Sequence, residues 1–215
     1  NTRPFHVDGR SLFEWKLDQI AKISSQFLEV VISTNDPEII EKFPDHLSGT
    51  NIRIDRRPDA LGRSTTKVQD LIDYVPTVTR GEWIFWLHAT SPFVTEIDYE
   101  AALRLWQSDV LNGENDSVMS VNRLQQFIWN DREKRIINAD RAVNPWPNTQ
   151  DLEPLFEINH AFYINSRVNY FTLKDRIGLR PALYVCEGLK KIDIDWMEDF
   201  DMAQSLISFH ENSAA

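Results

Sequence analysis

Short apolar runs alternate with helix-like periodicity along the first half of the chain. Four runs rich in β-branched or aromatic residues predict buried strands at 27–32, 52–56, 83–87 and 117–121. Between them, apolar residues recur at helical spacing and predict helices that start near Ser11, Asp36, Val68 and Thr95. This alternation predicts an α/β fold, a mostly parallel sheet with helices on both faces. Ligands of such sheets bind at the carboxyl ends of the strands.

The alternation stops between Asn122 and Asn159. Two apolar runs, 127–129 and 136–137, flank a polar turn and predict a β-hairpin, which a proline-containing segment follows. We therefore expect residues 122–154 to form an arm inserted into one α/β domain made of residues 1–121 and 155–215. The arm either folds back on its own domain or packs on a second copy. Its aromatic side chains Phe127, Trp129 and Trp146 favour a homodimer.

Composition narrows the class of protein. The chain has 215 residues, a net charge of -10 and no long Lys/Arg cluster, whereas a duplex nucleic-acid binder needs a basic face. No apolar run approaches the roughly 20 residues that span a bilayer. Cys186 is the one cysteine, so no intrachain disulfide forms, and no signal peptide is visible. We expect a cytoplasmic protein whose partners are neither nucleic acid nor membrane.

Two aspartates near the C-terminus are the first candidates for chemistry. Residues two apart in a strand share a face, so a strand over 192–195 would present Asp193 and Asp195 together. Two such carboxylates suit a hard divalent cation. The tetrapeptide alone equally fits a half-buried strand with a solvated acidic face, which is the commoner case. Asp199 and Asp201, just beyond, are expected to favour the start of a helix.

Three further groups suit a nucleotide or a sugar. His88, Thr90 and Ser91 directly follow the strand at 83–87, where a nucleotide would lie; the alternative is a loop that leads to the Thr95 cap. Arg57 could meet a phosphate or a base carbonyl, although paired arginines are usually solvated.

Amides and a phenol suit sugar hydroxyls. Gln150, Asn159 and Tyr163 supply them, while neighbouring Phe162 equally fits a strand whose aromatics fill the core.

The order of these motifs resembles the acylneuraminate cytidylyltransferases, the CMP-sialic acid synthetases. The resemblance covers nearly the whole chain and rests on an ordered set: Asn1-x-x-Pro4-Phe5, Ser33-Thr34-Asn35-Asp36, Arg56-Arg57-Pro58, Thr90-Ser91-Pro92, Asp116-Ser117-Val118-Met119-Ser120, Asn159-x-Ala161-Phe162-Tyr163 and Ile192-Asp193-Ile194-Asp195. It implies a Rossmann-like nucleotide-diphospho-sugar transferase fold, CTP and an acidic sugar as substrates, Mg²⁺ and a homodimer.

The resemblance also implies roles for single residues. Asp193 and Asp195 match the metal carboxylates, and Arg57 matches an arginine near the cytosine. Asn1 matches the asparagine that closes the phosphate loop. On the sugar side, Gln150 and Asn159 look like the family's amides. The implied reaction is attack of the anomeric hydroxyl of a 2-keto-3-deoxy sugar acid on the α-phosphate of CTP, with release of pyrophosphate.

Three departures from the family's pattern bear on recognition. The family's opening strand and its glycine-rich basic loop should precede Asn1, so we expect about 20 further residues in the native protein, with the strand–loop–helix logic of phosphate sites. His88 and Val94 replace a base-reading glutamine and an arginine, and His160 replaces a glycine. No residue stands out as the general base. A same-fold transferase for another base or sugar, or a non-catalytic nucleotide-sugar binding domain, remains an alternative.

Overall fold

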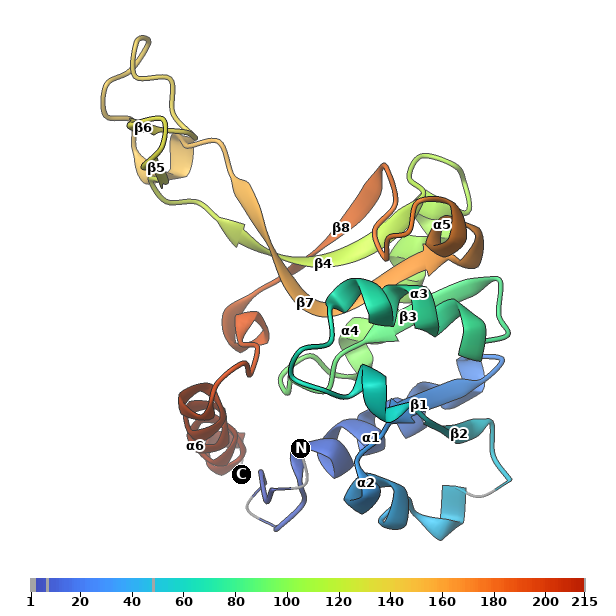
Figure 1. The fold of residues 1–215 in the computed structure, drawn as a ribbon. Coiled ribbons are helices and arrows are strands. Elements are labelled where there is room, and N and C mark those ends of the chain that lie inside the picture. Colours follow the sequence, from blue (N-terminus) through green and yellow to red (C-terminus); the bar gives the residue numbers. More distant parts are fainter. Residues whose placement is uncertain (1–2, 7, 48, 215) are drawn as a thin grey trace.

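The computed structural model describes residues 3–6, 8–47 and 49–214, with side chains described as far as residue 207. Its strands form a mixed α/β arrangement (Figure 1). Strands β1 (Val30–Thr34) and β2 (Ile52–Arg56) pair in parallel as a sheet of their own. The main sheet has the order β3-β7-β4-β8, with β3 at Trp83–Leu87, β4 at Ser117–Leu124, β7 at Leu155–Ser166 and β8 at Pro181–Cys186. The predicted α/β class is confirmed.

Strand direction in the main sheet follows from the connections. Strands β4 and β8 are parallel, whereas β7 runs antiparallel to both β3 and β4. Strand β7 returns directly from β4 through the arm, and an antiparallel return requires no crossover helix.

Helices cover both faces of the main sheet, as predicted. The helices are α1 (Leu12–Ile23), α2 (Pro37–Glu41), α3 (Val68–Val78), α4 (Glu96–Leu105), α5 (Arg167–Thr172) and α6 (Met197–Ala214). Of these, α2 packs on the β1-β2 sheet and α6 packs on α1. Ile84 of β3 packs with α3 and α5, whereas Phe85 of the same strand packs with Tyr99 of α4. This is the two-sided alternation of a strand. No helix in the described part of the chain has the length and hydropathy to cross a membrane.

Helices α1 and α4 begin with the capping interactions that the sequence predicts. Ser11 Oγ accepts a hydrogen bond from the Glu14 backbone N–H at 3.2 Å, and the Glu14 carboxylate accepts the Ser11 N–H at 2.8 Å. At the start of α4, the Thr95 N–H donates to Asp98 Oδ2 at 2.9 Å. Both reciprocal arrangements satisfy donors that a helix leaves free at its first turn.

Two predicted strands differ from the observed structure. The strand expected at 27–32 begins only at Val30, because a 3₁₀ turn follows α1 and Phe27 packs edge-on against Phe85 at 5.8 Å. The strand expected at 192–195 does not form. Another 3₁₀ turn, Gly188–Lys191, carries the chain away from β8, and the segment is extended without a strand partner. Ile192 and Ile194 nevertheless pack in the predicted apolar direction, against a cluster that contains Phe200.

The connection between β4 and β7 forms the predicted arm. Strands β5 (Trp129–Asn130) and β6 (Arg135–Ile136) make the expected hairpin, which projects away from the helices that cover the sheet (Figure 1). Strand β4 continues to Leu124, three residues into the segment that was expected to belong to the arm. Trp129 and Trp146 are 53% and 66% exposed. Phe127, the third aromatic residue on which the homodimer prediction rests, is half-buried and packs edge-on against Trp146, with ring centroids 5.4 Å apart.

Candidate functional site

The loop after β3 brings predicted nucleotide and metal residues together. The Ile194 N–H donates to the Thr90 carbonyl at 2.9 Å, which fixes the 192–195 segment beside the loop. Ser91 is buried, and its hydroxyl donates to Asp193 Oδ1 at 3.5 Å. Thr90, Ser91 and Asp193 therefore lie side by side at the carboxyl end of β3, although more than 100 residues separate the two segments in the sequence.

A buried lysine of α1 donates hydrogen bonds to the backbone of this loop. Lys16 is 2% exposed, and its ammonium donates to the Ser91 carbonyl at 2.9 Å, the Val94 carbonyl at 2.6 Å and the Tyr99 hydroxyl at 2.8 Å. Burial lowers the pKa of Lys16 to about 7, while the charges of Asp98 and Glu96 oppose the shift.

Sequence reasoning missed Lys16, although a signal was present. The lysine lies four residues after Leu12 and four before Ile20, on the buried face of α1.

A second cluster lies at the next strand along. Arg176, only 9% exposed, donates to His160 Nδ1 at 3.0 Å and lies 3.4 Å from His88 Nε2. Its guanidinium carbon lies 4.3 Å from the Tyr163 ring centroid. The Tyr163 hydroxyl is 2.7 Å from His160 Nδ1. His88 was predicted on the nucleotide side and Tyr163 on the sugar side; their rings lie 6.4 Å apart between centroids.

Charge and burial set the protonation of this cluster. Burial, with the charge of Arg176 and the proximity of His160, lowers the pKa of His88 to about 4, so the imidazole is neutral at pH 7. Burial raises the pKa of Tyr163 to about 12, opposed by Arg176 and assisted by Asp175 and Asp193. The influence of Asp193 on Tyr163 links this cluster to the Ser91 loop. Neutral His88 is a weak base, which argues against its use as the general base.

A bulge in β7 shapes the cluster. Met119 pairs with Tyr163 but Val121 pairs with Ile158, so residues 159–162 have only Ser120 opposite them. Within this bulge His160 adopts a left-handed backbone with φ of 62°. Glycine takes this conformation without strain, which gives a physical reason for the glycine that the resemblance led us to expect there.

The remaining predicted residues are dispersed. Asn159 is 5% exposed, and its side chain donates to Asn122 Oδ1 at 3.1 Å and accepts the Ala161 N–H, so it is committed to the bulge. Arg57 directly follows β2, and its buried Nε has no hydrogen-bond partner in the described part of the chain. Gln150 is exposed in the 3₁₀ turn Thr149–Asp151 of the arm. Asn1 lies outside the described residues. Sugar-side and nucleotide-side roles for these four stay predictions.

The two aspartates predicted to hold a metal differ in setting. Asp193 is half-buried at the Ser91 loop, whereas Asp195 is exposed. Within residues 3–6, 8–47 and 49–214, no group of three or more His, Cys, Asp or Glu side chains is arranged to hold a metal ion. Asp193 and Asp195 fit Mg²⁺ only in the manner in which that ion usually binds, with water and substrate phosphates completing its ligands.

Asp199 favours the start of a helix, as the sequence predicts. Asp199 accepts the Trp196 N–H at 2.8 Å and caps α6.

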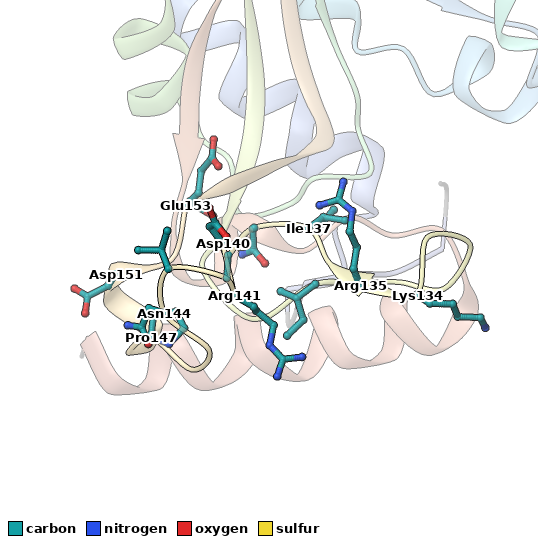
Figure 2. A pocket seen from close by; sticks show the side chains of 13 residues that line it. Lys134, Arg135, Ile137, Asp140, Arg141, Asn144, Pro147, Asp151 and Glu153 are labelled. Atoms are coloured by element: carbon teal, nitrogen blue, oxygen red, sulfur yellow. Dashed lines mark hydrogen bonds between the residues drawn. The ribbon is translucent and has the colours of Figure 1, made fainter.

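A separate concavity lies on the arm. It has a volume of about 850 Å³, is open to solvent, and is lined by residues between Lys134 and Glu153 (Figure 2). Its charged side chains carry both signs, among them Arg135, Arg141 and Asp151. None of the residues of the Ser91 loop or the Arg176 cluster lines it. We place the candidate site at the strand ends because the buried titratable groups with shifted pKa values converge there.

Solved structures share this fold, although no family model matches the chain. A 4-diphosphocytidyl-2C-methyl-D-erythritol synthase from Anaerococcus prevotii is similar at a TM-score of 0.62 and 15% identity, over 97% of this chain and 94% of that one. A CMP-2-keto-3-deoxy-manno-octonic acid synthetase complexed with CTP is similar at 0.61 and 14%, over 97% and 92%. A 2-C-methyl-D-erythritol 4-phosphate cytidylyltransferase from Thermus thermophilus follows at 0.54 and 14%, over 96% and 93%. At these identities the likeness establishes the fold.

Proposed function

We propose that this protein is a CTP-dependent cytidylyltransferase that transfers CMP to an acidic sugar of the 2-keto-3-deoxy type. The observation that carries the proposal is the convergence of the Ser91 loop, Asp193 and the Arg176 cluster at one end of the sheet. The fold supports it, because solved structures of that fold are named for cytidylyl transfer, one of them to a 2-keto-3-deoxy sugar acid.

The proposed reaction forms one bond and breaks another. The anomeric hydroxyl oxygen of the sugar bonds to the α-phosphorus of CTP while the bond from that phosphorus to the bridging β-phosphate oxygen breaks. Pyrophosphate leaves, and the hydroxyl proton passes to solvent. Such a transfer depends mainly on positioning the two substrates and on neutralising phosphate charge.

The chain's own residues supply the positioning. The Ser91 loop, fixed on the Lys16 ammonium, would line the nucleotide side, and Tyr163 with Arg176 the sugar side. Asp193 and Asp195 would hold Mg²⁺, which when bound supplies charge neutralisation for the phosphates.

Pyrophosphate release tests the proposal. The purified protein is incubated with Mg²⁺ and CTP, ATP, GTP or UTP in turn. Each is offered N-acetylneuraminic, legionaminic, pseudaminic or 3-deoxy-manno-octulosonic acid, or 2-C-methyl-D-erythritol 4-phosphate. We expect release that requires both CTP and a sugar acid. Release with another nucleotide or only with the sugar phosphate would favour a same-fold transferase of different specificity. Binding without release would favour a non-catalytic nucleotide-sugar domain.

We also propose that the arm makes a homodimer. Trp129, Val143 and Trp146 expose apolar surface on a projecting segment, which a second copy would cover. Light scattering at micromolar concentration should give the mass of a dimer. The double substitution Trp129→Ser and Trp146→Ser should give a monomer that melts at a similar temperature, because both rings are mostly exposed. Wild-type protein that is monomeric under these conditions would exclude this role for the arm.

A further inference from the structure

Arg176 is an unusual buried cation. It is 9% exposed, and no Asp or Glu side chain lies within ion-pair distance of its guanidinium in the described part of the chain. The adjacent Asp175 is exposed and instead accepts the Ile177 N–H at 3.1 Å. Arginines with this degree of burial are normally paired with an anion, because an unpaired buried charge costs several kcal/mol.

Two imidazoles and two aromatic rings contact the guanidinium. Its two terminal nitrogens face His160 Nδ1 at 3.0 Å and His88 Nε2 at 3.4 Å, and the second contact is long for a hydrogen bond. The faces of Tyr163 and Trp86 lie over it, with ring centroids at 4.3 and 5.4 Å from the guanidinium carbon. Cation–π contacts offset part of the cost of burial, but they neutralise no charge. A guanidinium has five N–H donors, and only two of them have partners here.

Two further observations concern the surroundings of Arg176. The hydroxyl of Tyr170 is buried without a hydrogen-bond partner in the described part of the chain, and its ring stacks on Trp86. Arg176 is near enough to Tyr170 for its charge to oppose the rise in that hydroxyl's pKa that burial causes.

His160 supplies the second observation. It is held in a left-handed backbone conformation with φ of 62° while its Nδ1 faces Arg176 and Tyr163. Strained residues of this kind persist where a site needs them.

We propose that Arg176, flanked by His88, His160 and Tyr163, is a receptor for the oxyanion of the acceptor substrate. The inference rests on the proposed function, to which it adds the residue that selects an acidic acceptor. Arginine's planar fork matches the two oxygens of a carboxylate or phosphate. The cluster draws His160 and Tyr163 from β7 and His88 from the end of β3, whereas Ser91 lies three residues further along the loop, beside Asp193, where the triphosphate is expected. The bound oxyanion therefore belongs to the acceptor.

The test compares wild type with Arg176→Gln and Arg176→Lys. Arg180→Gln is the matched control, because it removes the same charge from an exposed position four residues along. Acceptors are 3-deoxy-manno-octulosonic acid, N-acetylneuraminic acid, the methyl ester of each, and 2-C-methyl-D-erythritol 4-phosphate. In Arg176→Gln we expect KM for the acid to rise at least about tenfold, since charge-assisted hydrogen bonds are lost. KM for CTP should stay within about twofold, and Arg176→Lys should lie between.

The esters separate recognition of charge from general damage to the site. Wild type should prefer each acid to its ester by at least about tenfold, and Arg176→Gln should lose that preference. A preference retained in Arg176→Gln, or a rise in KM for CTP in place of KM for the acid, would overturn the proposal. If wild type turns over the sugar phosphate and Arg176→Gln does not, Arg176 is still the receptor, and the anion that it binds is a phosphate.

Binding without turnover distinguishes failure of this inference from failure of the proposed function. If wild type releases no pyrophosphate with any acceptor, the proposed function fails. The receptor is then tested by thermal melting with each acid, ester and phosphate alone. We expect at least one of the anions to raise the melting temperature of wild type and of Arg180→Gln equally, and to raise that of Arg176→Lys by less. Equal stabilisation of all proteins, or none by any of the anions, contradicts the receptor. Arg176→Lys retains the charge, so this comparison does not depend on whether Arg176→Gln folds.

Discussion

Lys16 and Arg176 are buried cations that contact opposite ends of one short segment, His88–Val94. Lys16 approaches from α1 and meets three oxygen acceptors, two of them backbone carbonyls of the segment. Arg176 approaches from the loop after α5 and meets only imidazole nitrogens and ring faces. The first cation has acceptors for its protons within the fold, whereas the second has no oxygen partner among the described residues. One therefore serves the architecture of the loop, and the other is open to a ligand.

If the reaction takes place beside Arg176, substitution of Asp193 or Asp195 should lower turnover and leave stability unchanged. Substitution of Lys16 should instead change stability. Asp195→Asn keeps the shape of the side chain and removes one charge. As a metal ligand, its loss should lower the rate of pyrophosphate release at saturating Mg²⁺ by at least about 100-fold, with the melting temperature nearly unchanged.

Asp201→Asn is the control for Asp195, because it removes the same charge from an exposed position in α6. It should leave turnover within about twofold. Wild-type turnover in Asp195→Asn would remove the metal role from that residue and reduce the proposed site to its binding groups.

The pH dependence of stability tests the role of buried Lys16. With a pKa of about 7 in the folded protein and 10.5 as its ordinary value, Lys16 is deprotonated on folding between these pH values. The unfolded chain then holds more protons, so the free energy of unfolding should rise with pH across this window and level off below pH 7. The stability of wild type relative to Lys16→Met should increase by up to about 4 kcal/mol from pH 7 to pH 10.

Denaturant titrations of wild type and Lys16→Met at pH 6, 7, 8.5 and 10 measure the difference between their free energies of unfolding. Groups other than Lys16 titrate in both proteins, so their contributions cancel in this difference. A difference that is flat with pH would show that the three acceptors keep Lys16 charged in the folded state as well.

A smaller effect is expected from the third acceptor of Lys16. Tyr99 accepts from the ammonium at 2.8 Å and donates to the Val94 carbonyl at 3.2 Å. Tyr99→Phe keeps the ring in the core and removes both hydrogen bonds, so the free energy of unfolding should fall by about 1.5 kcal/mol. Chemical denaturation measures the loss, and KM for CTP reports whether the loop shifts. A neutral result would mean that the two carbonyls alone satisfy the lysine.

The smallest effect marks what an ordinary lysine on the same helix contributes. Lys22 pairs with Glu96 at 2.7 Å, with the lysine side chain 61% exposed. Because solvent screens such a pair, Lys22→Ala should change the free energy of unfolding by no more than about 0.5 kcal/mol. The same denaturant titration measures it. A loss comparable to that of Lys16→Met would mean that burial does not distinguish the two lysines.

Local signals in the sequence located most of the secondary structure. The capping pair of Ser11 and Glu14, the hairpin in the arm and the apolar run at 83–87 all have the predicted structure. The failure at 192–195 has a physical reason. Alternation of apolar and acidic residues requires one buried side, and an extended segment on the side of a domain meets that requirement without a strand partner. The pairing of Thr90 with Ile194 could not be inferred from either segment alone.

The sequence by itself determined the α/β class, the helix starts and the residues that could carry chemistry, because these depend on periodicity and on contacts between near neighbours. Only the tertiary structure decided which of those residues meet. It brought Ser91 to Asp193 and placed Gln150 in an exposed 3₁₀ turn whose carbonyl accepts from Gln125. It also revealed Lys16, whose acceptors lie at least 75 residues away in the sequence, and Arg176, which meets His160 of β7 and, 88 residues away, His88. Burial and the absence of an oxygen partner are properties of those surroundings, so no local pattern encodes them.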